Sequence, residues 1–275
     1  MAFWKKLTAY VGWNSVHEAA GSGRRSRVWN PGDPGAVSAM LATGNQLRVK
    51  SRDLMRRNAW AANAVDSFVS NAIGTGIKPQ SLVDDPKFRE RIHALWWQWV
   101  EEADSNNLTD FYGLQSLACR AMVEGGECLI RIRNRRQEDG LSVPIQLQIL
   151  EPEHLPLSLN TLSASGNPIR SGIEFDALGR RVAYHLYREH PGDPVNGNDL
   201  VSVPADEIVH LFRPLRPGQI RGEPWLSRAL VKLNELDQYD DAELVRKKTA
   251  AMFAGFITRQ SPEDQLLGEG EADEL

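Results

Sequence analysis

The sequence predicts an α+β fold with N-terminal helices first, antiparallel hairpins next and one long helix last. Three observations lead to this prediction. In several stretches between residues 36 and 125, apolar residues recur every three or four positions, which is the period of an amphipathic helix. From Glu127 onward apolar and polar residues alternate, as in strands that face a core on one side. After Pro224 the helical spacing returns, and no proline interrupts it up to residue 258. Helices and hairpins that occupy separate parts of a chain are typical of α+β proteins.

Length and composition narrow the class of protein. The 275 residues can bury the core of one or two domains. The net charge of −4 argues against a protein that coats nucleic acid by bulk attraction. Two cysteines, Cys119 and Cys128, suggest no disulfide framework, so we expect a reducing cytoplasm. The first residues do not resemble a signal peptide, and no stretch approaches the ~20 apolar residues that span a bilayer, so no membrane partner is expected.

The chain divides into four parts. Residues 1–44 are expected to form a flexible N-terminal arm, because most of this stretch is rich in Gly, Ser, Arg and Pro. Residues 45–212 carry the helices and hairpins of the α+β region. Residues 213–258 form a turn followed by the long helix. Residues 259–275 form an acidic tail, which we expect to be disordered or to be the truncated end of a longer protein.

The N-terminal helices have recognisable boundaries. One continuous helix is expected over residues 36–73, where Gly74 stops it. The acid–proline pair at residues 85–86 begins a second helix, and Asp110 caps a third that ends at the glycine pair 125–126. Both cysteines are expected to be small buried side chains.

Three tryptophans lie close together in the second helix. Trp96, Trp97 and Trp99 could stack on bases of a nucleic acid. Core packing explains Trp96 and Trp99 better, because they share a helix face with other apolar residues. Trp97 lies off this face.

The period-two pattern predicts five strands, which form hairpins. The second pair flanks a loop of about five residues. The expected strands are residues 128–133, 145–150, 169–175, 182–187 and 207–212.

The long helix is the element around which the chain is organised. A helix from Pro224 to residue 258 would be roughly 50 Å long. Pro224 suits the first helical turn. Apolar residues recur along it and predict one apolar stripe. They are Leu226, Leu230, Leu233, Leu236, Ala242, Val245, Met252 and Phe256, with Tyr239 between. A helix of this length is either packed on its own domain or an assembly element, and the residues alone favour neither.

A search for catalytic chemistry gives little. Six histidines occur, none in the spacing of a known two-histidine metal motif, and no cofactor or metal is expected. His185, His190 and Asp193 could converge on a metal across a hairpin, but scattered histidines explain them better. The alternative function is therefore a metal-dependent or nucleic-acid-processing enzyme that uses His185, His190 and His210. A further hypothesis is a monomeric DNA-binding module that uses the arginine-rich residues 48–57.

A long motif around the last helix carries a resemblance to a known family. The motif contains RPGQIRGEPWL at residues 216–226, YDDAELV at 239–245 and AAMFAGFI at 250–257. It resembles the lambda-type family of tailed-phage portal proteins. Weaker similarities upstream, at residues 52–58, 74–79, 172–176 and 184–187, extend the resemblance over about residues 45–258.

The resemblance implies a structural protein and not an enzyme. Members of this family form a ring, generally of twelve copies, at one vertex of the phage head. Double-stranded DNA passes through the ring. The terminase motor docks on it, as do head–tail connectors and capsid or scaffold proteins. The chain would thus belong to the virion, and to the host cytoplasm during assembly. Residues 45–212 would correspond to a wing-like region. Family members continue well past this point, so the chain corresponds to an N-terminal portion.

The same resemblance suggests roles for particular residues. We expect Arg216, Gly218, Gln219, Arg221 and Gly222 to form a turn that positions the long helix, and not a ligand site. Trp225 is expected to help subunits meet. Arg246, Lys247 and Lys248 are the candidates for charge that faces the DNA channel.

Overall fold

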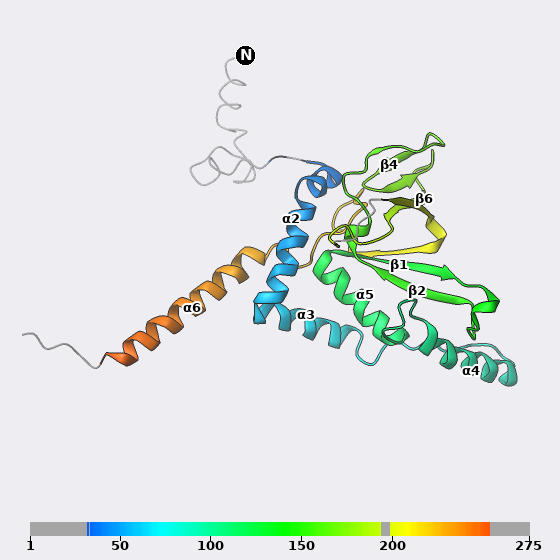
Figure 1. Cartoon of the computed structure of the whole chain (residues 1–275), viewed down its shortest axis with the longest axis horizontal. Coiled ribbons are helices and arrows are strands. Elements are labelled where there is room, and N and C mark those ends of the chain that lie inside the picture. The colour runs from blue at the N-terminus through cyan, green and yellow to red at the C-terminus, as the bar shows by residue number, and fades with distance from the viewer. Residues whose placement is uncertain (1–31, 33, 194–198, 254–275) are drawn as a thin grey trace, which may run out of the picture.

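A computed structural model of the chain describes residues 32, 34–193 and 199–253. Helices come first, two antiparallel sheets follow, and a long helix ends the described part (Figure 1). This order confirms the predicted α+β class. The acidic tail 259–275 and most of the predicted arm lie outside the described residues.

Five α-helices carry the helical part of the described chain. They are α2 (Ala36–Arg57), α3 (Ala59–Ala72), α4 (Pro86–Glu102), α5 (Phe111–Gly125) and α6 (Leu230–Met252). The predicted starts of α4 and α5 are confirmed. Asp85 accepts a hydrogen bond from the N–H of Lys87, and Asp110 accepts one from the N–H of Gly113. Gly126, with φ of 90°, ends α5. α2 begins at Ala36, inside the stretch assigned to the arm.

The single helix predicted over residues 36–73 is wrong, because the chain turns at Asn58. Asn58 has extended backbone angles, so α2 ends and α3 begins at this residue. Its side-chain oxygen accepts a hydrogen bond from the N–H of Ala61 and caps α3. Its amide nitrogen donates to the carbonyl of Leu233 on α6, 3.1 Å away. One residue therefore ends a helix, begins another and contacts a third.

The strands form two sheets, and all paired strands are antiparallel. The first sheet has the order β2-β1-β8 and the second has the order β3-β4-β5-β6-β7. The first sheet contains β1 (Glu127–Asn134), β2 (Ile145–Leu150) and β8 (Ile208–Phe212). The second contains β3 (Thr161–Leu162), β4 (Pro168–Arg170), β5 (Ile173–Phe175), β6 (Arg181–Tyr187) and β7 (Leu200–Pro204). After β7 the chain returns to the first sheet, where β8 pairs with β1.

The strand predicted over residues 169–175 is wrong, because it is two short strands joined by a tight turn. Arg170 on β4 pairs with Ile173 on β5, so only Ser171 and Gly172 lie between them. Both have positive φ, 50° and 82°, as a two-residue hairpin turn requires. The alternation of apolar residues continued through this turn and concealed it. Strands β3 and β7 were not predicted.

Buried side chains form a core between the sheets and two clusters among the helices. Leu129, Leu150, Ile173, Leu186 and Val203 belong to the core between the sheets. The helix clusters join α2, α3 and α5 to the segment that precedes α6. Both cysteines are buried, as predicted.

The aromatic residues of α4 pack less completely than expected. The rings of Trp96 and Trp99 contact each other and Phe111 on α5, and both are half-buried. Trp97 is exposed. Val100 is the one fully buried residue of this helix.

The long helix begins later than predicted. Pro224 is not in a first helical turn, because residues 225–229 form turns and α6 begins at Leu230. The backbone N–H of Trp225 donates to the carbonyl of Val123 at the end of α5, which holds this segment against the helices. The residues from 254 to 258 lie outside the described part.

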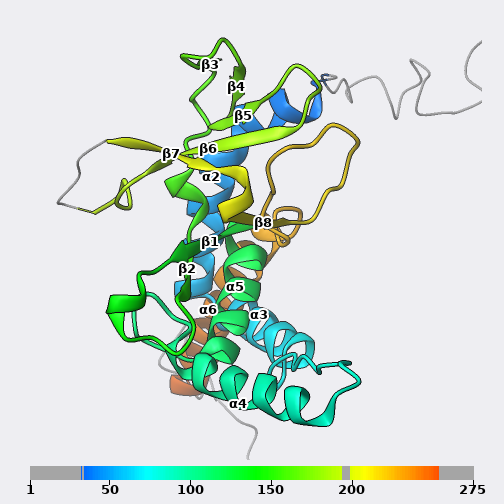
Figure 2. The same cartoon turned by 90° about the vertical axis from the view of Figure 1, so that its right-hand side faces the viewer.

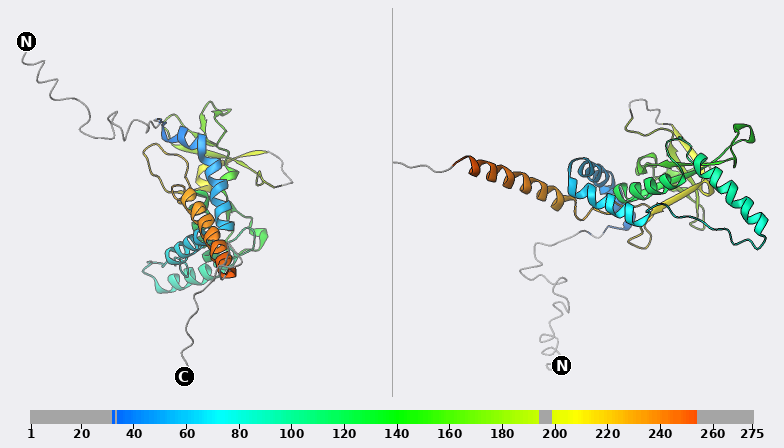
Figure 3. Two further views of the ribbon diagram at one scale, coloured as in Figure 1. Left: turned by 90° about the vertical axis from the view of Figure 1, so that its left-hand side faces the viewer. Right: turned by 90° about the horizontal axis from the view of Figure 1, so that it is seen from below.

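From its base, α6 extends away from the body of the molecule (Figures 1 and 3). Leu230 is its single buried residue. The helix also does not have the single apolar stripe that the sequence predicted. Six apolar or aromatic residues follow one another every three positions from Leu230 to Val245. Because three residues fall about 60° short of a full turn, this row winds around the helix. Among the described residues, no helix is both long enough and apolar enough to cross a membrane.

Candidate functional site

The loop between β8 and α6 is closed by the side chain of Gln219. Its oxygen accepts hydrogen bonds from the N–H groups of Leu215 and Arg216, 2.7 and 3.3 Å away. Its nitrogen donates to the carbonyl of Arg221 at 2.8 Å. Gly218, with φ of 78°, makes the turn inside this loop. The Arg216 side chain is exposed and donates to the carbonyl of Pro34. The two ends of the loop are thereby fixed relative to each other.

Arg221 leaves this loop and enters the interior, where it is 1% exposed. Its guanidinium donates to three backbone carbonyls, those of Ser171, Pro152 and Leu155, at 2.8, 3.2 and 2.9 Å. Ser171 lies in the β4–β5 turn, and the other two lie just after β2. Its Nε also donates to the carboxylate of Glu127 at 2.8 Å. Arg221 therefore joins the loop before α6 to both sheets.

Glu127, the first residue of β1, is fully buried and accepts hydrogen bonds from four groups. Arg221 and Arg48 on α2 contact one carboxylate oxygen, and the Arg48 contact is 2.5 Å long. The Nε2 of His210 and the backbone N–H of Gly222 donate to the other oxygen, at 2.9 and 2.7 Å. We call Arg48, Glu127, His210 and Arg221 the buried charge cluster. It links α2, β1, β8 and the loop before α6.

The electrostatics of the cluster favour an ionised Glu127 and a neutral His210. Burial alone would raise the pKa of Glu127, but Arg221, the His210 hydrogen bond and Arg48 outweigh it and hold that pKa far below its usual range. Burial lowers the pKa of His210, and the contact with Glu127 offsets this only in part. Since an ionised carboxylate can only accept, the Nε2 of His210 carries the proton.

Two glycines allow the backbone of the loop before α6 to pass in direct contact with the backbone that joins α5 to β1. A Cβ on Gly222 would lie 2.0 Å from the carbonyl oxygen of Gly126. A Cβ on Gly126 would lie 2.3 Å from the carbonyl carbon of Glu223. Neither position can accommodate a side chain, so close approach of the two backbones requires glycine at both.

Trp225 follows this crossing and packs against the helices of its own copy. Its ring lies edge-on to Phe68 of α3, with the ring centres 5.0 Å apart, and the guanidinium of Arg213 lies 5.3 Å from the ring centre. The indole is half-buried. Its role between subunits stays a prediction.

The histidines of the alternative enzyme hypothesis do not share a site. His185 contacts Glu174 at 3.0 Å, His190 contacts Glu151 at 3.2 Å, and His210 belongs to the buried charge cluster. Each ring therefore has a different carboxylate partner.

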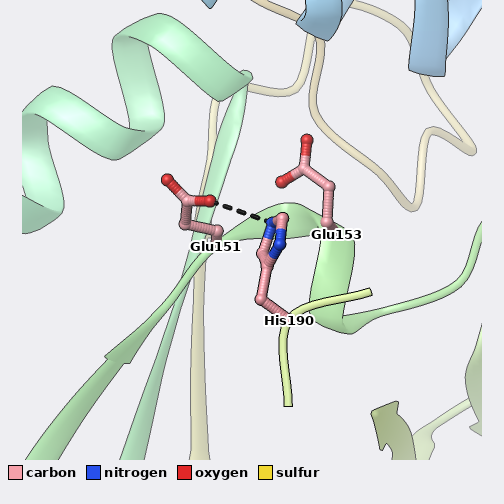
Figure 4. Close-up of side chains that lie close together, drawn as sticks. All are labelled: Glu151, Glu153 and His190. Carbon is pink, nitrogen blue, oxygen red and sulfur yellow. Dashed lines mark ion pairs between the residues drawn. The ribbon is translucent and has the colours of Figure 1, made fainter. Parts of the chain in front are cut away.

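One group of potential metal ligands exists among the residues that the structure describes. Glu151, Glu153 and His190 each bring a ligand atom within 4.8 Å of the others (Figure 4). The guanidinium of Arg52 already lies 2.8 Å from Glu153 and 3.4 Å from Glu151. The N–H of Gly192 donates to the Nδ1 of His190, so the neutral ring carries its proton on Nε2, facing Glu151. These residues form an ion-pair cluster, and we assign no metal to them.

The three basic residues proposed for the DNA channel lie on the outer half of α6 and are exposed. Arg246 contacts Glu243 at 2.6 Å, and Lys247 lies 3.8 Å from the same carboxylate. Lys248 has no ion pair with a described residue. Glu243 therefore offsets part of the positive charge. Whether these residues face DNA stays a prediction.

Sequence reasoning singled out Arg221 and, separately, His210, but it did not place them on one carboxylate, that of Glu127. Glu127 is 79 residues from Arg48 and 94 residues from Arg221, and no local pattern links positions so far apart. The available signal was a glutamate directly after a glycine pair, at the start of a strand that carries apolar residues.

Comparisons with known proteins agree with the motif in the sequence. A family model described as phage portal protein, lambda family, matches residues 22–274. The chain is 28% identical to a probable portal protein of Halomonas phage phiHAP-1, over 83% of this chain and 46% of that protein. It is 22% identical to the portal protein of Escherichia phage N15 and 21% identical to portal protein B of Escherichia phage lambda. Each alignment covers 95% of this chain, and they cover 53% and 52% of those proteins. The chain thus spans about half the length of the curated relatives it matches.

Proposed function

Because this chain belongs to the lambda family of phage portal proteins, we propose that it acts as a structural subunit of a portal ring and not as an enzyme. As the resemblance to this family implies, the ring would hold about twelve copies at one vertex of the phage head. Such a ring closes through heterologous contacts between copies. Double-stranded DNA would pass through its centre during packaging and ejection. The terminase, head–tail connectors and capsid or scaffold proteins would dock on it. The subunit would assemble in the host cytoplasm and remain in the virion.

The observation that carries this proposal is the exposure of α6. The helix leaves the body of the molecule (Figure 3). Several of its apolar side chains are exposed along its length. Val231 is 66% exposed, Val245 62% and Met252 81%. Exposed apolar residues of this kind are stabilised when another surface covers them.

The winding of this row supports a ring more than a simple dimer. A subunit in a ring has one neighbour on each side, so a helix between neighbours benefits from apolar residues on more than one face. The exposed residues at every third position from Leu236 to Val245 provide this.

The base of α6 supports a role as a fixed strut. Leu230 packs with Leu54 and Ala61, and the carbonyl of Leu233 accepts a hydrogen bond from Asn58. The buried charge cluster holds the loop that leads into the helix. In this proposal these contacts set the direction in which α6 leaves the body, and therefore the angle between neighbouring copies.

We also propose that Arg246, Lys247 and Lys248 face the channel. Each phosphate that a cation neutralises adds salt-dependent affinity, which would slow the movement of DNA. Glu243 lies beside two of these cations and would keep that affinity low.

Negative-stain electron microscopy of the purified chain tests the proposal. Closed rings with a central hole are the expected result. Uniform small particles without rings would contradict it.

A further inference from the structure

A cavity of about 370 Å³ opens between the two sheets. The strands that line it lie on the side of the molecule away from α6 (Figure 1). Three arginines line it: Arg131 and Arg133 on β1, and Arg188 just after β6. The rest of the lining comes from both sheets and contains the apolar residues Leu150, Leu186 and Val201 together with Gln148 and Tyr187. Positive charge set between apolar walls produces a stronger local field than the same charge on an open surface.

The strand pattern explains how arginines come to lie at this place. Leu129, Arg131 and Arg133 alternate along β1 and share one face of the strand. Leu129 is fully buried in the core between the sheets. The row therefore continues from an apolar core into the cavity, where it changes from leucine to arginine.

The described chain offers few acidic groups or hydrogen-bond acceptors to offset the positive charge in this cavity. The Nε of Arg131 is buried without a hydrogen-bond partner, and its nearest carboxylate, on Glu207, is 3.9 Å away. Among the described residues, the side chains of Arg133 and Arg188 have no hydrogen bond or ion pair. Burial lowers the pKa of Arg131, and the neighbouring Arg133 lowers it further. The cavity would be stabilised by an added anion.

The half of α6 nearer the body of the molecule carries an excess of negative charge. Glu235, Asp237, Asp240 and Asp241 lie within seven residues, and none forms an ion pair with a described residue. This acidic segment and the arginine cavity lie on opposite sides of the molecule. In Figure 2 the strands that line the cavity face the viewer, and α6 lies behind them. The two surfaces cannot meet within one copy, but they can meet head to tail between copies.

We propose that the arginine cavity receives the acidic segment of α6, residues 235–241, from a neighbouring copy. This inference rests on the proposed ring and adds a specific contact to it. Arginine binds carboxylates through paired hydrogen bonds, and acidic side chains on a helix extend far enough to enter a cavity. DNA is a poorer occupant, because its phosphates lie on a stiff convex surface and binding them would hinder its passage.

Disulfide formation between two copies tests the contact without removing any charge. One tagged copy carries Gln148→Cys, in the wall of the cavity. A second, differently tagged copy carries Gln238→Cys, within the acidic segment. Cys119 and Cys128 are buried and should not interfere. Under mild oxidation we expect a disulfide between the two copies, with a yield about tenfold lower in 1 M salt, where charges are screened beyond ~3 Å. The matched control replaces Gln148→Cys by Gln98→Cys on the exposed face of α4.

A charge swap separates a lost contact from a misfolded variant. Adding Arg131→Glu and Arg133→Glu to the first copy should lower the yield by about tenfold or more. Adding Asp240→Arg and Asp241→Arg to the second copy should restore part of it. Equal yields from Gln148→Cys and Gln98→Cys would overturn the inference. A labelled DNA duplex that binds the cavity and blocks the disulfide, with no rescue by the swap, would overturn it in favour of a phosphate site.

The outcome also separates this contact from the ring itself. Closed rings without the disulfide would refute the contact and leave the portal proposal intact. The disulfide without rings would support the contact and count against the ring.

Discussion

Glu127 is the residue that fixes distant parts of this chain in their relative positions. Four donors from α2, β8 and the loop before α6 converge on its carboxylate, which has no access to solvent. A buried ion pair adds little net stability compared with apolar packing, but removal of one partner leaves a buried charge uncompensated. The cluster therefore fixes the geometry of the loop more than it raises the stability of the fold.

Replacement of Glu127 should reveal this dependence. Glu127→Gln keeps the size of the side chain but leaves Arg48 and Arg221 without a counter-charge. We expect the free energy of unfolding to fall by about 3–5 kcal/mol, measured by urea denaturation. The exposed Glu138→Gln serves as control. A change as small as that of the control would show that the cluster does not depend on this charge.

Gly222 is the second residue whose replacement has a clear expected cost. The Cβ of Gly222→Ala would overlap the carbonyl oxygen of Gly126, so one of the two backbones must move. We expect a loss of about 1–3 kcal/mol or more, seen as a lower melting temperature. Gly35→Ala, whose Cβ would meet nothing within 4 Å, should leave the melting temperature nearly unchanged. If the two variants melted alike, the crossing would be looser than described.

The hydrogen bonds of Glu174 lead to a prediction about how the stability of the protein depends on pH. Hydrogen bonds from Asn167, then His185 and Ser165, outweigh the effect of desolvation and lower its pKa from 4.5 to about 2. A lowered folded-state pKa adds stability that is present above pH 4.5 and is lost as the pH falls towards 2.

Glu174→Gln should remove this part of the pH dependence. We expect the stability of the wild-type protein to fall more steeply than that of the variant between pH 4.5 and pH 2, measured by denaturation at each pH. Parallel curves for the two proteins would contradict the assignment.

At the scale of elements, the sequence predicted helices best where a cap marks their start. α4 and α5 begin one residue after Asp85 and Asp110, as expected from the preference for aspartate at this position. The break at Asn58 was not predictable in the same way. Asparagine is only mildly unfavourable inside a helix, and the apolar period continues across it. The break depends on a contact with α6, 175 residues away.

Asn58→Ala tests whether this break holds α6 in place. The variant loses the cap of α3 and the hydrogen bond to Leu233, and we expect about 1–2 kcal/mol of destabilisation. Hydrogen exchange should also become faster in the first turns of α6. Asn71→Ala, which loses only a hydrogen bond within α3 at an exposed position, is the matched control. Unchanged exchange in α6 would show that Asn58 does not support it.

The remaining differences from the sequence prediction have tertiary causes. The Ser171–Gly172 turn is stabilised by bonds from its backbone to Asn160 and Leu159, which lie outside the predicted hairpin. Residues 225–229 have helical apolar spacing but form turns, because Trp225 is held against α5. The candidate site was predictable only as a loop containing Arg221. Its partners came together through the fold.

At the scale of the whole molecule, the described part of the chain is a compact body of two sheets and four α-helices from which a fifth α-helix projects (Figures 1 and 3). A projecting helix with exposed apolar residues is more stable when a second surface covers it. The account therefore depends on α6 as the element through which copies associate.

Sedimentation velocity of the wild-type chain and of Leu244→Asp/Val245→Asp tests this claim most directly. Both side chains are exposed on α6, so the substitutions should not unfold the body. Leu82→Asp/Leu108→Asp, at positions that are 88% and 84% exposed elsewhere, is the control. The account predicts a closed ring for the wild type and the control, and a monomer with an unchanged melting temperature for the α6 variant. A wild-type monomer, or an α6 variant that still forms rings, would contradict it.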